Sequence, residues 1–248
     1  VEQTWQYLPA TIDACHLRRR QILTARASNT QVQSLSVWKT RLPVVNYTNS
    51  HYATLVRFVA SQSGLGNDLD ELCSATFEGV LGQPGLDPTE NCMVLEHGDQ
   101  VKGLALVFRE FPIGRSIIEV ITTPEITGSP EDIELVNRAV AQAKSARLNV
   151  AHVCVPQGSG RGKILKQAGF SVVRTYLDML WNLGNLPEVT LPPRYSVRSF
   201  EPGDTALLTG IQNDAFTGSW GFCPNTEEQI EYRTRMPNTS KAGSLFLF

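Results

Sequence analysis

The sequence predicts an α/β (α+β) protein built on a mixed, mostly antiparallel sheet with one βαβ crossover. Three strand-like segments follow one another closely at 91–97, 101–111 and 116–123, as expected for an antiparallel meander. The third is followed by a segment of helical periodicity and then by a nearly all-apolar run at 150–155. Such a run is typical of a parallel strand that is covered on both faces.

The composition excludes several classes of protein. With 248 residues, 42% hydrophobic and 19% charged, the chain has an ordinary globular composition and room for one or two domains. The formal charge of −2 argues against a partner that is a nucleic acid or a membrane surface. The five cysteines form no CxxC pair and no metal-type cluster with histidine, so we expect no metal and reduced thiols in a cytoplasmic protein. Because the chain starts without Met and stops within a strand-like run, we also expect a fragment.

The N-terminal part is expected to differ from the rest. Residues 1–44 are rich in Gln, Ser and Thr and carry an excess of basic side chains, which predicts a solvated, disordered extension. A first domain is expected over 45–185. It begins with a strand at 54–59 and a helix that Asn67 or Asp68 caps, and the meander follows with a turn at Gly114.

The crossover helix has a clear start. Ser129 can cap it, Pro130 takes the first helical position, and Asp132 lies three residues after the cap. Apolar residues then recur at helical spacing, which predicts a helix over 130–147 and a right-handed crossover into the strand at 150–155. A short helix ending at Gly169 and a hairpin within 171–183 complete the unit.

The chain is then expected to begin again. Residues 186–194 are a Pro-rich linker. Beyond it, Ile211–Gly218 repeats the pattern of Leu72–Gly79, with an apolar residue, a Phe and a Gly at matching positions and a Gly/Pro break after each. This predicts an internal repeat in which 195–248 is the truncated N-terminal part of a second, similar domain.

This order of elements resembles the GNAT acetyltransferase family. The resemblance is carried by the strand and helix pattern of 116–155 and by Ile164–Phe170, a helix that ends at Gly-Phe before the strand-like Val173–Met179. Two units joined by a linker are similar to tandem GNAT proteins of the mycothiol synthase type. The resemblance implies an acyl-CoA-dependent N-acyltransferase that moves an acetyl group from acetyl-CoA to a small-molecule or peptide amine by direct transfer.

The resemblance also implies where acetyl-CoA would bind. It would lie in the wedge between the strands at 116–123 and 150–155, with its pyrophosphate at the start of the crossover helix, where free N–H groups and the positive end of a helix attract an anion. The implied cofactor-binding residues are Val120, Ile121, Thr122, Gly128 and Ser129.

The loop before this helix departs from the family pattern Gln/Arg-x-x-Gly-x-Gly/Ala. Aligned on Gly128, the first position is Glu125 and the last is Pro130; an alternative register puts Thr127 first and Asp132 last. Pro130 lacks an N–H, and the acidic residues that follow bring negative charge to the place of a diphosphate. We therefore expect a helix start built for capping and a degenerate first domain that binds CoA poorly.

A second stretch matches the pattern in its residue types but not in its structural context. Gln157–Gly162 reads Gln-x-x-Gly-x-Gly, but the helix after it is too short for a crossover. It is not a Walker loop, because Lys163 is followed by Ile164. We predict a turn in which Arg161 and Lys163 are solvated.

Few residues are candidates for catalysis. Glu119 is the one carboxylate placed like the family's frequent general base. The position of the family's acid, four residues before the Gly of Gly-Phe, is Leu165, and Tyr176 is expected to pack in the hairpin. His152 and Cys154 share one strand face, where we expect a core pair rather than a nucleophile with its base.

Two hypotheses follow from the sequence. The first is a tandem N-acyltransferase whose chemistry lies mainly in the second unit. The second is a non-catalytic module, built on a degenerate GNAT fold, that senses acyl-CoA or binds a protein. Glu125, Pro130 and Leu165 at the expected functional positions motivate the second hypothesis. The acceptor amine and the oligomeric state stay open.

Overall fold

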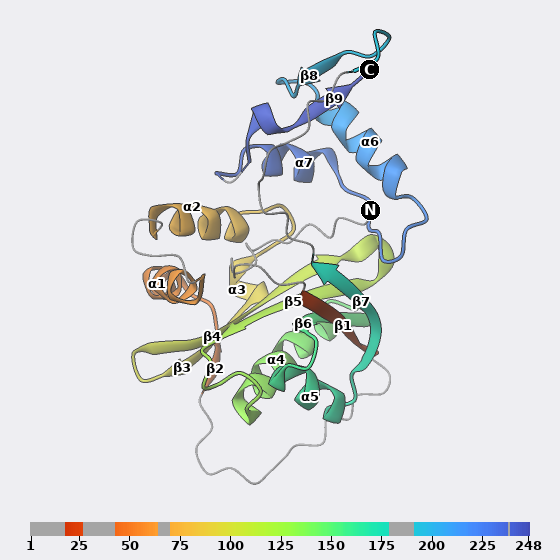
Figure 1. The fold of residues 1–248 in the computed structure, drawn as a ribbon. Helices are drawn as coiled ribbons and strands as arrows, with labels where there is room; N and C mark the ends of the chain where they lie inside the picture. Colours follow the sequence, from red (N-terminus) through yellow and green to blue (C-terminus); the bar gives the residue numbers. More distant parts are fainter. Residues whose placement is uncertain (1–17, 27–42, 64–69, 179–190, 238) are drawn as a thin grey trace.

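The computed structural model describes residues 18–26, 43–63, 70–178, 191–237 and 239–248. Its centre is a seven-stranded sheet in the order β2-β3-β4-β5-β6-β1-β7 (Figure 1). The pair β5 and β6 is parallel, and the other neighbouring pairs are antiparallel. The predicted mixed, mostly antiparallel sheet is therefore confirmed.

The strands of this sheet are β1 (Arg18–Arg26), β2 (Val44–Asn46), β3 (Cys92–His97), β4 (Gln100–Glu110), β5 (Arg115–Thr122), β6 (Val150–Pro156) and β7 (Ser171–Asp178). The helices between them are η1 (Asn49–His51), α1 (Tyr52–Ser63), α2 (Asp70–Leu81), α3 (Pro88–Asn91), η3 (Phe111–Ile113), α4 (Pro130–Ser145) and α5 (Gly160–Gln167). The meander, the crossover and the short helix thus lie where the sequence predicted them.

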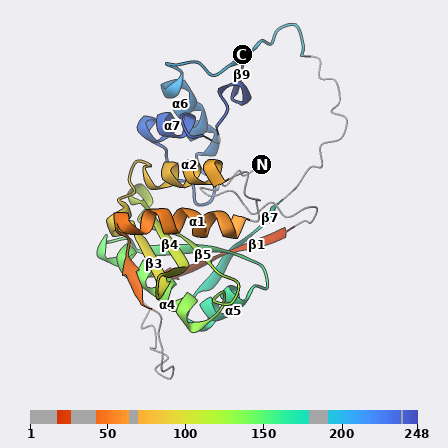
Figure 2. The same cartoon turned by 90° about the vertical axis from the view of Figure 1, so that its left-hand side faces the viewer.

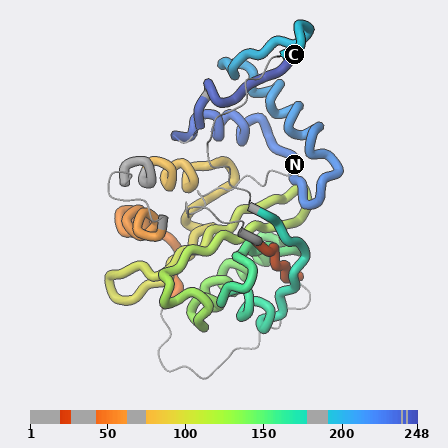
Figure 3. Tube along the Cα trace, in the orientation of Figure 1, coloured from red at the N-terminus to blue at the C-terminus, as the bar shows by residue number. Residues whose placement is uncertain are grey.

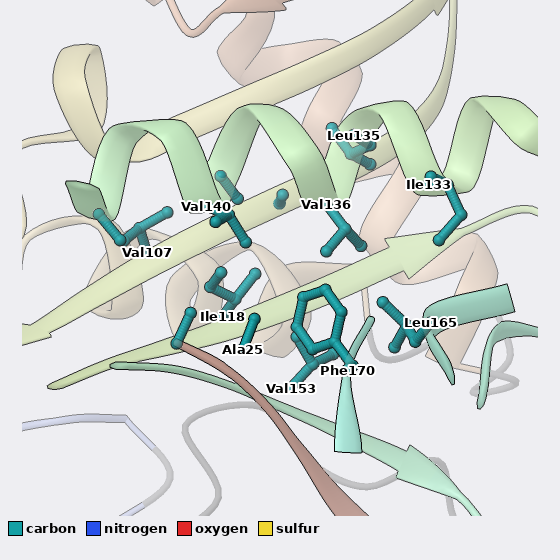
Figure 4. Close-up of a cluster of buried hydrophobic side chains, with 14 of the residues drawn as sticks. Ala25, Val107, Ile118, Ile133, Leu135, Val136, Val140, Val153, Leu165 and Phe170 are labelled. Carbon is teal, nitrogen blue, oxygen red and sulfur yellow. The ribbon is translucent and has the colours of Figure 1, made fainter. Parts of the chain in front are cut away.

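Helices cover both faces of the sheet. Helices α4 and α5 lie on one face and α1 and α2 on the other (Figure 2). The α4 face buries an apolar cluster to which Ile118, Val136 and Phe170 belong (Figure 4). The opposite face buries a second cluster that includes Leu55, Phe77 and other side chains of α1, α2, β3 and β4. Because β4 is covered on both faces, it reads as a continuous apolar run rather than an alternating one.

The prediction of a strand at 54–59 is wrong, because these residues belong to α1. Leu55 and Phe58 are buried against the α1/α2 cluster, and Val59 packs on it as well. Their spacing of three and four residues places them on one helical face. The β-branched content of this short run also fits a strand, which explains the error.

The prediction that residues 1–44 lie outside the fold is wrong for 18–26. These residues form β1, which lies between β6 and β7 and pairs with both. Ile22, Leu23 and Ala25 are buried. The predicted closing hairpin is also corrected, since β7 pairs with β1, while residues 179–183 lie outside the described residues. The apolar run of β1 is too short to stand out from its polar surroundings.

The C-terminal residues form β8 (Val197–Ser199), α6 (Thr205–Phe216), α7 (Glu227–Thr234), η4 (Lys241–Gly243) and β9 (Leu245–Leu247). Strands β8 and β9 pair in an antiparallel sheet of their own, and the trace places these elements beyond α2 (Figure 3). Apart from the short helices η1, α3 and η4, the order strand, helix, helix, strand is also that of β2, α1, α2 and β3. However, the two matched motifs lie on α2 and α6, the second and the first helix of the two series. The motif match aligns α2 with α6, whereas the order of the elements aligns α1 with α6. The predicted sequence repeat and the order of the elements therefore give different alignments.

Candidate cofactor site

Strands β5 and β6 pair only over the first half of β5. The parallel pairing runs from Arg115 with Val150 to Ile118 with Val153. Beyond Ile118, β5 stays paired with β4 as far as Thr122. The two parallel strands therefore separate from Glu119 onward, and the predicted cofactor residues Val120–Thr122 lie on the separated part.

The guanidinium of Arg161, on the first turn of α5, is bonded to this part of β5. Its Nη1 donates to the carbonyl of Val120 at 3.0 Å and its Nη2 to Oγ1 of Thr122 at 2.7 Å. Its Nε lies 2.9 Å from both carboxylate oxygens of Asp132. The Arg161 side chain is 11% exposed and that of Asp132 is fully buried. The α4 side of the wedge is thus closed by a buried ion pair.

The N–H groups at the start of α4 are bonded within the chain. The N–H of Gly128 donates to Asp132 Oδ2 at 2.8 Å, and that of Ser129 to the carbonyl of Ile126 at 2.8 Å. The hydroxyl of Ser129 accepts from the N–H groups of Glu131 and Asp132 at 3.2 and 3.3 Å. Pro130 has no N–H to offer. The donors that would hold a diphosphate at this helix start are therefore already in use.

The loop at Gly128 also packs closely against the start of α5. Gly128 has a φ of +82°, and a Cβ there would lie 2.8 Å from the carbonyl carbon of Gly160. In both alignments of this loop with the family pattern, the polar side chains are paired with other residues of the chain. Glu125 lies 3.6 Å from Nζ of Lys102, and Asp132 pairs with Arg161. The predicted cap at Ser129 is confirmed.

Arg161 was missed by the sequence reasoning, which expected it to be solvated. The sequence does indicate that Asp132 needs a partner, because Asp132 lies on the apolar stripe of α4, four residues before Val136 and eight before Val140. A carboxylate on a buried stripe requires a cation or several donors. Lys163, two residues after Arg161, is exposed as predicted.

Glu119 lies on the opposite face of the sheet from Arg161. Its neighbours at alternate positions, Ile117 and Ile121, pack on the α1/α2 cluster, whereas Ile118 and Val120 pack on the α4 cluster. Glu119 is half-buried, and burial raises its pKa to about 7, an effect that the nearby charge of Arg20 on β1 opposes. A carboxyl group with such a pKa can exchange a proton near neutrality.

The remaining candidates lie in different surroundings. Leu165 is fully buried in the α4 cluster. Tyr176 is half-buried, with the guanidinium of Arg174 5.7 Å from its ring centroid. His152 is buried as predicted, and burial, with a smaller contribution from Arg115, lowers its pKa to about 4. The core prediction is wrong for Cys154, which lies on the same strand face as His152 but is exposed.

Two further predictions concern motifs and metals. The stretch at Gln157–Gly162 forms the predicted turn into α5, with Ser159 as the cap. Within the described ranges, no group of three or more His, Cys, Asp or Glu side chains could hold a metal ion. In the same part of the chain, no helix has both the length and the apolar character needed to cross a membrane.

Comparison with known proteins adds to this geometry. No protein-family model and no curated protein matches the sequence. Solved structures do match: a GCN5-related N-acetyltransferase from Sphaerobacter thermophilus aligns with a TM-score of 0.51 and 14% identity, over 65% of this chain and 50% of that one. The chain has the GNAT fold.

A GNAT-family acetyltransferase from Colwellia psychrerythraea aligns with a TM-score of 0.48 and 8% identity, over 64% of this chain and 54% of the other. The chain thus spans about half the length of these structures. In this GNAT fold, the separation of β5 from β6 is the wedge to which the family resemblance assigned acetyl-CoA.

Proposed function

We propose that this chain belongs to an acyl-CoA-dependent N-acyltransferase of the tandem GNAT type, similar in arrangement to mycothiol synthase. It would move an acetyl group from acetyl-CoA to a small-molecule or peptide amine by direct transfer. The first unit, β1 together with 45–185, is the supporting half. One observation carries this division of roles. The polar groups described above, at the wedge and at the start of α4, are bonded to one another and not left free for a cofactor.

The free energy needed to open the wedge favours a supporting role for the first unit. For CoA to use the carbonyl of Val120 and the N–H of Gly128, the pair between Arg161 and Asp132 would have to open. Breaking a buried pair of this kind costs about 3–5 kcal/mol. Since each 1.4 kcal/mol is tenfold in a binding constant, the apparent affinity for CoA would fall by roughly two to four orders of magnitude.

The C-terminal residues support the assignment of the chemistry to a second unit. Apart from the short helices η1, α3 and η4, the series β8, α6, α7 and β9 has the order of β2, α1, α2 and β3 in the first unit, and the end strands of both series pair antiparallel. This likeness is the basis for the tandem arrangement and for residues 195–248 as the opening of a second GNAT unit. Glu119, with its pKa near neutrality, remains the candidate base of the first unit.

The closed wedge also favours a second candidate function. A GNAT fold whose cofactor groups are bonded to one another can serve as a non-catalytic protein-interaction module. Such a module would bind neither acetyl-CoA nor an acceptor amine.

Release of CoA distinguishes the two candidates. The full-length protein is incubated with acetyl-CoA and a panel of amines, and the free CoA thiol is measured against a sample without amine. The acyltransferase predicts release with at least one amine. No release with any amine, together with no binding of acetyl-CoA by the full-length protein, would reject the acyltransferase and leave the interaction module.

A further inference from the structure

A loop of the C-terminal unit lies on one face of the sheet, over the half that contains β1. His152 of β6 pairs in register with Thr24 of β1, and Arg174 of β7 with Ile22. Directly opposed residues point to the same face, so these side chains share the face opposite α4. Helix α1 covers a neighbouring part of this face, where it packs against β4 and β5.

Trp220 of the loop between α6 and α7 contacts this face. Its ring is stacked on that of His152, with 5.6 Å between centroids and an interplanar angle of 2°. The guanidinium of Arg174 lies 5.3 Å from the Trp220 ring. β1 separates β6 from β7, and the β1 partners of His152 and Arg174 are two residues apart, so the Cα atoms of the two residues lie about 12 Å apart. The Trp220 indole lies between their side chains and contacts both.

A second contact fixes the residue after Trp220. Arg115 at the start of β5 is buried and ion-paired with Glu110, and its Nη2 donates to the carbonyl of Gly221 at 2.6 Å. Gly221 has a φ of +70°, and a Cβ there would lie 2.6 Å from Nη1 of Arg115. The positive φ favours glycine at this position, and a side chain there would also displace the Arg115 guanidinium.

A third contact joins α7 to α2. The hydroxyl of Tyr232 donates to the carbonyl of Gly79 at 2.7 Å. A Cβ on Gly79 would lie 3.1 Å from Cε of Met236, which packs on the α1/α2 cluster. The absence of a side chain at Gly79 thus allows Met236 to approach α2. Gly82, just after α2, does the same for Tyr232, because a Cβ there would lie 2.7 Å from the Tyr232 hydroxyl.

The loop is also held by its own unit. The side chain of Asn213 donates to the carbonyl of Asn225 at 3.0 Å and accepts from its N–H at 2.9 Å. Nη1 of Arg233 donates to Oδ1 of Asn225 at 2.7 Å. The C-terminal end of the loop is therefore fixed to α6 and α7, while its middle is fixed to the first unit.

We propose that Gly79, Arg115, His152 and Arg174 form an intramolecular docking surface whose partner is the loop 217–225 with α7, and that β1 completes this surface. The docked loop makes the two units unfold together. The low pKa of His152 fits this role, because a neutral imidazole can be buried against an indole without leaving an unpaired charge. The proposal does not depend on acyl-CoA binding by either unit.

Hydrogen exchange of the 248-residue chain tests the docking surface. In Trp220→Ala we expect amide exchange of residues 217–225 to rise about tenfold, since an aromatic stack and a cation–π contact are lost, while the amides of α4 keep their rate. The matched control is Leu207→Ala, which removes a side chain that is 41% exposed on α6. An unchanged rate in Trp220→Ala, or an equal rise in both variants, would overturn the proposal.

Calorimetry of the wild type keeps the test decisive if Trp220→Ala folds poorly. Tyr232→Phe removes the one hydroxyl that bonds Gly79 and keeps the ring. By calorimetry, we expect the wild type to unfold in one transition and Tyr232→Phe with Trp220→Ala to unfold in two. Two transitions already in the wild type would contradict joint unfolding, and a single transition in the double variant would show that these contacts do not couple the units.

Discussion

Two carboxyl groups lie on opposite sides of the point where β5 leaves β6, and their surroundings differ. Asp132 is fully buried and bonded to Arg161, on the α4 side. Glu119 is half-buried on the other side, where burial raises its pKa to about 7. The pair of Asp132 and Arg161 holds the wedge closed, whereas Glu119 can change its charge near neutrality. The side to which the resemblance assigned acetyl-CoA is thus held by an ion pair, and the opposite side keeps a titratable group.

The largest effect is expected from opening the closed side. Arg161→Ala leaves the carboxylate of Asp132 buried without its cation, so the free energy of unfolding should fall by about 3–5 kcal/mol in urea denaturation. Lys163→Ala, on the same helix but exposed, should change it by less than about 0.5 kcal/mol.

A double variant sharpens this result. Arg161→Met combined with Asp132→Leu removes both charges and should recover most of the lost stability, because apolar pairs of similar volume replace buried ion pairs well. If Arg161→Ala were as stable as Lys163→Ala, the ion pair would not hold the wedge closed.

The close packing of the loop gives the next largest effect. Gly128→Ala and Gly158→Ala both place a side chain at a positive φ, of +82° and +79°, but only at Gly128 would the new Cβ meet backbone within 4 Å. Both variants should lose about 1–2 kcal/mol from the conformation alone. Gly128→Ala should lose about 1–3 kcal/mol more from the overlap with Gly160, measured by urea unfolding. Equal losses would show that the loop is not pressed against α5.

Glu119 should give a smaller, pH-dependent effect. Its folded pKa of about 7 lies above the ordinary value of 4.5, so the folded state holds the proton more tightly than the unfolded state. Its ionisation therefore lowers stability progressively as pH rises from about 4.5 to about 7, and the effect is absent at lower pH. Because the group is partly exposed, we expect about 1–2 kcal/mol.

The check compares unfolding free energies of the wild type and Glu119→Gln from pH 4.5 to 8. The difference between them should change across the window and then level off. Glu125→Gln is the control, since the pKa of the exposed Glu125 is lowered by its own backbone N–H and by Thr123, which puts its effect at lower pH. A flat difference for Glu119→Gln would mean that this carboxyl is not perturbed.

Local signals made the centre of the fold predictable from the sequence. The cap at Ser129 and the apolar spacing of α4 depend on neighbours within one or two turns. The strand β1 could not be found in this way, because its partners lie more than a hundred residues away, in β6 and β7. In α1, the run from Leu55 to Val59 fits two periods, and only packing against α2 decides between them.

Less of the candidate site could be predicted. The resemblance assigned Val120–Thr122 to the cofactor, and the structure places them on the part of β5 that is no longer paired with β6. Their role in cofactor binding stays a prediction. The partner that closes the wedge, Arg161, lies 29 residues from Asp132, and no spacing rule links a residue of one helix to a carboxylate in another. The buried stripe position of Asp132 shows that a partner is needed, but not which one.

Titration of residues 1–248 with acetyl-CoA tests the closed wedge most directly. We expect the melting temperature to change by less than about 1 °C at saturating acetyl-CoA, because the groups that would bind it are bonded to one another. A functional site would raise it by roughly 5–10 °C at a hundred times the dissociation constant. A saturable shift of that size would contradict the account of the first unit as a supporting half.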